Sequence, residues 1–219
     1  MSDVRPFAGL RPRLDLAAAV ASPPYDVLSS EEARALARDN PHSFLHVIKA
    51  EIGLDASADV HGEDVYALSA SNFRKMVSEG TLIRDETPCF YVYRLTMGDH
   101  VQHGLVVGAS VAEYESGDIK KHEHTRPDKE NDRARHVQQL RANAGPVLFT
   151  YRASADVDAV VSRICTGATP DYDFVADDAV GHTLWVVSDA ADVAAIQQAF
   201  AGVDALYVAD GHHRTASAF

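Results

Sequence analysis

The chain of 219 residues has only two cysteines, Cys89 and Cys165, and no run that approaches the ~20 apolar residues of a membrane span. Two separate cysteines in apolar surroundings predict buried free thiols in a reducing compartment rather than a disulfide framework. No secretory leader is expected, because Arg5, Arg11 and Arg13 interrupt the start of the sequence. These deficits together predict a cytoplasmic protein without a membrane segment.

Basic residues are also scarce, since 20 Lys and Arg stand against 32 Asp and Glu, for a formal net charge of −12. Broad binding to nucleic acid or to a membrane surface needs clustered positive charge, so neither partner is expected. A local basic pocket for a nucleotide is still compatible with this balance. The apolar content of 46% is ordinary for a globular protein, and the length suits one large domain or two small ones.

Helical and strand patterns are mixed along the chain, without a clear repeat. Helices are predicted over residues 29–39, 62–78, 127–143, 156–165 and 192–200. Strands are predicted over residues 44–48, 89–97, 101–111, 147–151, 172–176, 182–187 and 203–209. This order predicts an α/β or α+β fold, with mixed sheets and flanking helices. A boundary near residues 112–120 would separate an N-terminal region, 1–112, from 113–219, and a single domain is the alternative.

The most informative segment is Asp210-Gly211-His212-His213-Arg214, which follows the apolar run 205–209. This order predicts a buried strand, a tight turn and the start of a helix. Gly211 lets the backbone approach a ligand, and the first amides of the helix would face an anion. Arg214 adds a fork suited to phosphate or carboxylate. Open α/β sheets bind ligands at such strand ends, although a polar turn with solvated histidines is the simpler alternative.

A second charged cluster occupies residues 120–133. Within it, Lys129, Asp132 and Arg133 share one helical face. Lys129 and Arg133 repel each other unless an anion lies between them, and a phosphate would satisfy both. The alternative is a solvated helix end with salt bridges. Glu123, between two histidines, is a candidate general base toward a hydroxyl or an oxygen ligand of Mg²⁺.

Two further patterns leave alternatives open. The segment Ser22-Pro23-Pro24-Tyr25-Asp26-Val27 is a stiff extended loop that either holds an aromatic ring against a ligand or serves as a rigid linker. The histidine-rich clusters lack the spacing of the zinc-protease helix, but on loops they would be able to assemble a zinc site. The candidate zinc ligands are His122, Glu123, His124, Asp210, His212 and His213.

Four segments together resemble the domain-of-unknown-function 1015 family of bacteria and archaea. They are Arg5-Pro6-Phe7 with Gly9-Leu10-Arg11; Pro23-Pro24-Tyr25-Asp26-Val27; His122-Glu123-His124-Thr125 with Lys129, Asp132 and Arg133; and Asp210-Gly211-His212-His213-Arg214. Asn143 and Pro146 also match. The family is similar to free L-serine kinases of the ParB/sulfiredoxin-like type, which share the terminal element. The resemblance therefore implies a ParB/sulfiredoxin-like element around the C-terminal strand, turn and helix.

The resemblance implies a small-molecule kinase that transfers a phosphoryl group from ATP, with Mg²⁺, to the hydroxyl of a free amino acid, L-serine above all. Glu123 would be the base, and Asp210 would hold Mg²⁺ or orient the nucleophile. His213 would assist a phosphate or the leaving oxygen. The residues expected to bind the nucleotide phosphates are Lys129, Arg133, Gly211, His212 and Arg214.

Other classes of function stay open from the sequence. A nucleotide-binding regulatory module without phosphotransfer is one, and a metal-dependent hydrolase is another. Members of the family typically continue well past the Asp-Gly-His-His-Arg element, whereas only Thr215 to Phe219 follow Arg214 here. The chain is therefore expected to be truncated relative to the family. A truncated chain would be inert, or would fold with a partner or as a swapped homodimer.

Overall fold

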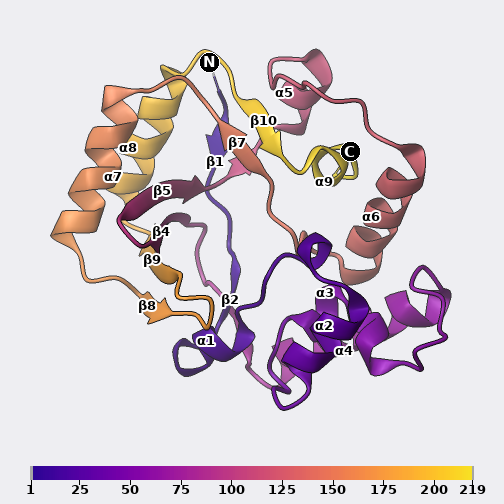
Figure 1. Cartoon of the computed structure of the whole chain (residues 1–219). Coiled ribbons are helices and arrows are strands. Elements are labelled where there is room, and N and C mark those ends of the chain that lie inside the picture. Colours follow the sequence, from indigo (N-terminus) through magenta and orange to yellow (C-terminus); the bar gives the residue numbers. More distant parts are fainter. Residues whose placement is uncertain (1, 219) are drawn as a thin grey trace. The chain divides into compact units, whose positions relative to one another are not determined.

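The computed structural model describes residues 2–218 and divides into two compact units, each built from separate stretches of the chain (Figure 1). Unit 1 contains the residues up to Leu14, Arg84–His122 and Phe149–Ala209. Unit 2 contains Asp15–Ile83, Glu123–Leu148 and the residues from Asp210 onward. Each unit therefore takes residues from both sides of the boundary predicted near residues 112–120.

Unit 1 is built on a four-stranded sheet with the order β5-β4-β9-β8, in which every neighbouring pair is antiparallel. Its strands are β4 (Phe90–Met97), β5 (His100–Val106), β8 (Tyr172–Val175) and β9 (Gly181–Val187). Gly98 turns the β4–β5 hairpin with a φ of 58°, as the Gly98-Asp99 pair predicts. The consecutive strands β8 and β9 form a second antiparallel hairpin.

Two amphipathic helices, α7 (Ala155–Gly167) and α8 (Ala190–Ala201), lie side by side in unit 1 (Figure 1). Ser154 and Asp189 cap their first amides. The helices share one apolar core with the sheet and the strands near it. Its buried members include Phe90, Val92, Trp185, Val187, Val157, Ile164, Ile196 and Phe200. Because Val92 and Trp185 lie on one face of the sheet and share this core with both helices, α7 and α8 cover that face.

Short elements complete unit 1. They are β1 (Val4–Arg5) paired with β6 (Gly108–Ala109), β2 (Leu10–Pro12), α5 (Val111–Ser116), and the paired strands β7 (Leu148–Thr150) and β10 (Tyr207–Asp210). The strand predicted over residues 101–111 ends at Val106 as β5, and β6 covers only Gly108–Ala109 of the rest. At Val111, the last residue of that prediction, the helix α5 begins instead. The backbone at Lys120 forms an isolated parallel bridge with Tyr207. The Lys120 amide donates to the Leu206 carbonyl, and the Lys120 carbonyl accepts from the Val208 amide.

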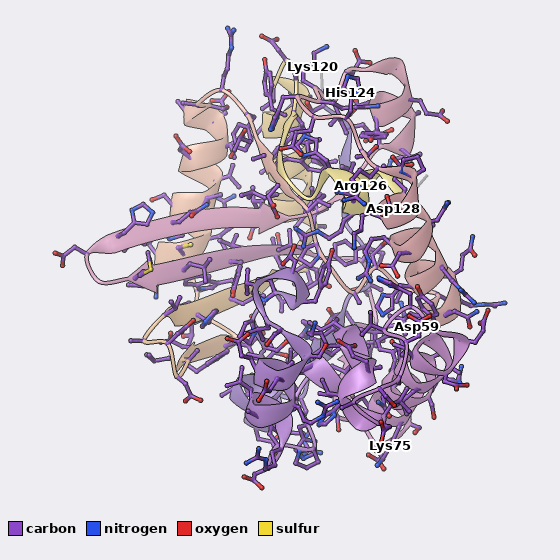
Figure 2. All side chains as sticks on the ribbon, turned by 45° about the vertical axis from the view of Figure 1, so that its right-hand side comes forward. Asp59, Lys75, Lys120, His124, Arg126 and Asp128 are labelled. Atoms are coloured by element: carbon purple, nitrogen blue, oxygen red, sulfur yellow. The ribbon has the colours of Figure 1, made fainter. Side chains whose placement is uncertain are left out.

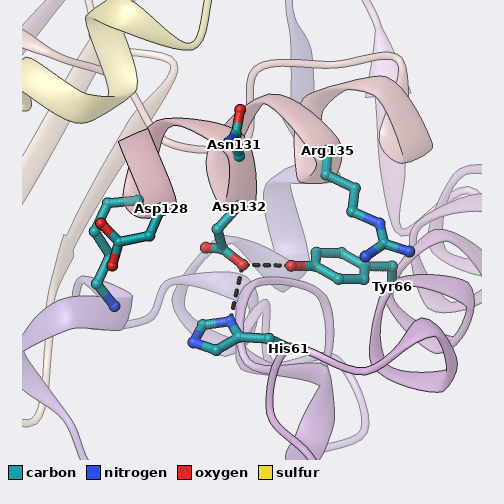
Figure 3. A pocket seen from close by; sticks show the side chains of 7 residues that line it. His61, Tyr66, Asp128, Asn131, Asp132 and Arg135 are labelled. Carbon is teal, nitrogen blue, oxygen red and sulfur yellow. Dashed lines mark hydrogen bonds and ion pairs between the residues drawn. The ribbon is translucent and has the colours of Figure 1, made fainter. Parts of the chain in front are cut away.

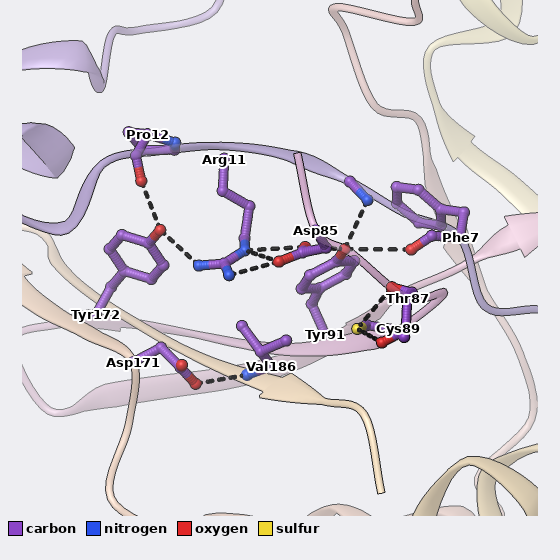
Figure 4. A network of polar contacts seen from close by, with 11 residues as sticks. Phe7, Arg11, Pro12, Asp85, Thr87, Cys89, Tyr91, Asp171, Tyr172 and Val186 are labelled. Atoms are coloured by element: carbon purple, nitrogen blue, oxygen red, sulfur yellow. Dashed lines mark hydrogen bonds and ion pairs between the residues drawn. The ribbon is translucent and has the colours of Figure 1, made fainter. Parts of the chain in front are cut away.

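A polar network fixes the start of the chain within unit 1 (Figure 4). The Arg11 guanidinium donates to the Asp85 carboxylate at 2.9 Å and to the Tyr172 hydroxyl at 2.7 Å. The Tyr91 hydroxyl donates to Asp85 at 2.6 Å and accepts the Gly9 amide. Burial alone would raise the pKa of Asp85, but the hydrogen bonds from Arg11 and Tyr91 outweigh it and hold that pKa below its usual range. Arg11 of the Gly9-Leu10-Arg11 segment thus has a structural role.

Unit 2 is mostly helical. Its elements are the short turns Leu14–Leu16, Tyr25–Val27 and Ala50–Gly53, the helices α1 (Ala17–Val20), α2 (Ser30–Ala37), α3 (Leu45–Ile48), α4 (Glu63–Ser78), α6 (Pro127–Leu140) and α9 (His212–Ala216), and the strand β3 (Leu82–Arg84). Ser29 and Glu32 form a capping box at the start of α2, where the sequence predicts a helix from residue 29. Pro127 occupies the first turn of α6, where the sequence predicts a helix from residue 127.

The strand predicted over residues 44–48 is wrong, because Leu45–Ile48 forms the one-turn helix α3. A short apolar run does not distinguish a buried strand from a buried helix. The deciding contacts come from α4, where Ser69 Oγ donates to the Val47 carbonyl and Asn72 Nδ2 donates to the His46 carbonyl, both at 2.7 Å. These side chains satisfy carbonyls that a single helical turn leaves without partners.

The molecule is thus a mixed α/β protein with small antiparallel sheets and flanking helices. Cys89 is buried and Cys165 is half-buried, and both are free, as predicted. Burial raises the pKa of both thiols. Within residues 2–218, the helices are too short or too polar to cross a membrane.

Candidate functional site

The predicted order of strand, turn and helix is confirmed, but the strand is shorter than the predicted 203–209, and Val208 is the one residue of β10 that is buried. β10 ends at Asp210, Gly211 adopts a left-handed conformation with a φ of 90°, and α9 begins at His212. A Cβ atom at position 211 would lie 2.9 Å from Arg214 Nε and 3.0 Å from Val147 Cγ1. Glycine is therefore favoured at this turn by its backbone angle and by the space around it.

Arg214 folds back over the turn instead of extending into solvent. Its guanidinium pairs with the Asp210 carboxylate, four residues earlier. A Cβ atom at position 145 would lie 3.2 Å from Arg214 Cδ, so the side chain lies in a slot between Gly145 and Gly211. The Arg214 side chain is 15% exposed and that of Asp210 is 66% exposed. The Arg214 guanidinium that the sequence predicts for an anion is thus present at the turn, and the exposed Asp210 carboxylate neutralises its charge.

The mid-chain segment and the terminal turn meet inside unit 2. Glu123 Oε2 lies 3.5 Å from His212 Nδ1, with Glu123 57% exposed and His212 6% exposed. The Arg126 amide donates to His213 Nε2 at 3.2 Å, across 87 residues of sequence. That bond requires His213 Nε2 to carry no proton. The structure therefore brings together Glu123, His212 and His213 from the two clusters that the sequence analysis identifies.

Local contacts between side chains orient this part of the chain at the start of α6. The Thr125 hydroxyl donates to Glu130, and the Arg126 guanidinium donates to Asp128 Oδ2 at 2.7 Å (Figure 2). Asp128 lies in the first turn of α6, where a carboxylate favours the positive end of the helix dipole. The Arg126 amide is therefore held where it reaches His213.

Lys129 and Arg133 have different environments, although they share a helical face. Arg133 Nε donates to Asp132 Oδ2 at 2.8 Å, and its guanidinium lies 4.4 Å above the centre of the Tyr25 ring. Tyr25, in the proline-rich loop, thus holds an arginine. Lys129 is exposed and forms no ion pair with the side chains in the described part of the chain. No phosphate is needed to neutralise Arg133, because Asp132 already matches its charge.

A pocket of about 300 Å³ lies beside α6, between that helix and residues of α4 and the preceding turn (Figure 3). Asp132 Oδ1 accepts from His61 Nδ1 at 2.9 Å and from the Tyr66 hydroxyl. The Arg135 guanidinium lies 4.5 Å above the centre of the Tyr66 ring and pairs with Glu63. No local pattern in the sequence predicts this pocket, because its contacts join residues about 70 positions apart.

Buried hydrogen bonds shift the pKa values in the wall of this pocket. Burial alone would raise the pKa of Asp132, but hydrogen bonds from Tyr66 and Arg133 outweigh it and hold that pKa below its usual range. Burial and the hydrogen bond to Asp132 raise the pKa of Tyr66. Asp132 therefore stays an acceptor for Tyr66 and His61 at neutral pH.

The residues predicted to bind metal are brought together only in part. Glu123 and His212 offer a carboxylate and an imidazole within one unit, and both are donor types that zinc accepts. Asp210 is exposed but pairs with Arg214. His122 and His124, on either side of Glu123 in the sequence, are both exposed.

Comparison with known proteins bears on the whole chain. The model of the family described as "Protein of unknown function (DUF1015)" matches residues 4–219. Searches of the curated proteins and of the solved structures found no match. The match includes the opening arginine segment, the proline-rich loop, the histidine–glutamate segment and the terminal turn. By the extent of that match, the chain belongs to the DUF1015 family.

Proposed function

We propose that this chain is a small-molecule kinase that transfers a phosphoryl group from ATP to the hydroxyl of a free amino acid. L-Serine is the acceptor that the resemblance to ParB/sulfiredoxin-like kinases implies. One observation carries the proposal: within unit 2, Glu123 lies against His212 and Arg126 lies against His213, in the turn that also holds Asp210 and Arg214.

Phosphoryl transfer requires positioning, neutralised charge and a base near the attacking hydroxyl. Glu123 supports the role of base because its carboxylate is exposed and lies beside His212 Nδ1. It takes the proton of the acceptor hydroxyl as the new O–P bond forms. The bond from the terminal phosphorus to the bridging oxygen breaks, and ADP leaves. The buried imidazole of His212 orients Glu123.

Residues of the terminal turn, 210–214, would bind the phosphates of ATP. Arg214 presents a guanidinium fork, which suits phosphate oxygens when they compete with Asp210 for it. His213, whose Nε2 accepts the Arg126 amide, supplies Nδ1 as a donor to an anion. The exposed Asp210 carboxylate would hold Mg²⁺. When bound, Mg²⁺ would neutralise negative charge on the phosphates.

The first test measures the reaction. Purified protein with ATP, Mg²⁺ and L-serine is expected to form ADP and O-phosphoserine, detected by coupled assay and mass spectrometry. Omitting L-serine or Mg²⁺ should stop ADP formation. Saturable nucleotide binding without transfer to any amino acid would replace the kinase with a regulatory nucleotide-binding module.

Glu123→Gln tests the proposed base. General-base assistance contributes typically about 10²- to 10⁴-fold, so transfer should fall by at least about a hundredfold while ATP affinity stays within about twofold. Glu79→Gln is the matched control, because the Glu79 side chain is also 57% exposed and pairs with exposed Lys75. Normal transfer by the Glu123 variant would assign the base elsewhere.

A second candidate, a metal-dependent hydrolase, is favoured by the Glu123–His212 pair. A carboxylate and an imidazole at this separation suit a zinc ion. Metal analysis of the protein purified without chelators separates the two functions. Stoichiometric zinc with loss of activity on chelation supports the hydrolase, and a zinc-free protein that turns over ATP removes it.

A further inference from the structure

We propose that the pocket beside α6 is the acceptor subsite and that it binds the carboxylate of a free amino acid. Its walls come from His61, Tyr66 and residues 128–135 of α6. The identity of the acceptor rests on the proposed function, whereas the preference for an anion follows from the pocket itself.

The preference for an anion follows from which charges in the pocket already have partners. Asp128 pairs with Arg126, and Asp132 pairs with Arg133. Arg135 pairs with Glu63. Both lining carboxylates are therefore occupied by arginines and offer little attraction to a further cation.

Two exposed polar side chains of the pocket are left without such contacts. Lys129 has no ion pair and Asn131 has no side-chain hydrogen bond among residues 2–218. An ammonium and an amide N–H₂ are donors to a carboxylate. Asp132 holds His61 by Nδ1, so the other ring nitrogen of His61 is directed away from that contact. The spare groups of the pocket therefore suit an anionic group.

The size and place of the pocket favour a small acid over a nucleotide. A volume of about 300 Å³ lies at the lower end of the range for small-molecule sites, which extends to about 1,000 Å³. Lys129 follows Arg126 by three residues, about 4.5 Å along the helix axis. Because the Arg126 amide contacts His213, an amino acid anchored at Lys129 lies on the same helix end as the proposed phosphate site.

The experiment compares L-serine with L-serinamide, which lacks the carboxylate, in the full chain and in Lys129→Met. Binding is measured by calorimetric titration, and KM by ADP formation. For the variant, the Kd and KM for L-serine should rise about tenfold, as expected for a lost charge-assisted contact. Affinities for L-serinamide and ATP should stay within about twofold, because this proposal places Lys129 at the acceptor carboxylate and not, as the sequence predicts, at the nucleotide phosphates. Asn131→Ala should move L-serine binding in the same direction.

Lys75→Met is the matched control, because Lys75 is an exposed lysine of α4, well apart from Arg126 and Asp128 (Figure 2). It should leave the Kd and KM for L-serine and the affinities for L-serinamide and ATP unchanged. A wild-type chain that binds L-serine through Lys129 but turns over no ATP would uphold the pocket and remove the kinase. Active wild type with an unchanged L-serine KM in Lys129→Met would overturn the pocket and keep the kinase. Weakened ATP binding instead, or no binding of L-serine by wild type, would also overturn it.

Discussion

Gly211 combines two independent constraints at the residue scale. Its φ of 90° is costly for a residue with a side chain, and a Cβ there would come within 3.0 Å of Val147 and closer to Arg214. The same slot holds the arginine that pairs with Asp210. The turn therefore depends on this glycine for its backbone and for the position of its guanidinium.

Gly211→Ala should destabilise the protein by about 1–3 kcal/mol, because the strained backbone and the close contacts are felt together. Urea unfolding followed by circular dichroism measures the change. Gly167→Ala is the control, since a Cβ at Gly167, in α7, meets nothing within 4 Å and its φ lies outside the left-handed range. An unchanged midpoint for Gly211→Ala would mean that the turn adopts another conformation.

At the scale of elements, α3 shows how one helix depends on another. Ser69 and Asn72 of α4 satisfy the carbonyls of Val47 and His46 at the end of this single turn. The hydroxyl of Ser69 also lies 3.0 Å from the Nε2 of buried His136, on α6. Tertiary hydrogen bonds, more than intrinsic propensity, thus decide the helical state of α3.

Asn72→Ala should cost about 1–3 kcal/mol, because it leaves the His46 carbonyl without its donor in a half-buried place. Thermal or urea unfolding of the full chain measures the change in the free energy of unfolding. Ser78→Ala, at the exposed end of the same helix, removes only a bond to the Lys75 carbonyl and should stay within about 0.5 kcal/mol of wild type. Equal stability of the two variants would contradict the assigned role of Asn72.

Local signals account for the elements that the sequence predicts correctly. The capping box at Ser29, the turn at Gly98 and the left-handed Gly211 each leave a short pattern in neighbouring residues. Long-range contacts leave no such pattern. Tyr25 against Arg133, and His61 and Tyr66 against Asp132, join separate segments, so the pocket and its charge pairing emerge only from the fold.

At the scale of the whole molecule, both units contain a carboxylate that the fold keeps ionised. The Arg11 and Tyr91 side chains lower the pKa of Asp85 in unit 1, against the effect of burial. Hydrogen bonds from Tyr66 and Arg133 do the same for Asp132 in unit 2. Protonation of either group in the folded state breaks hydrogen bonds that the unfolded chain lacks, so acid should weaken both units.

The sign of this pH dependence follows from linkage. A carboxylate with a lowered folded pKa contributes stability that is complete above its unfolded pKa, about 3.9, and is lost as pH falls through the folded pKa. Urea unfolding from pH 7 to pH 2 should therefore show stability falling below about pH 4. Asp85→Asn and Asp132→Asn should each lower the free energy of unfolding at pH 7. Each should also reduce the fall in stability below about pH 4, called here the acid limb. Exposed Asp128→Asn, whose carboxylate contacts Arg126 at the surface, should change the stability at pH 7 much less than either of these variants. Variants that keep the full acid limb would show that these two carboxylates do not control it.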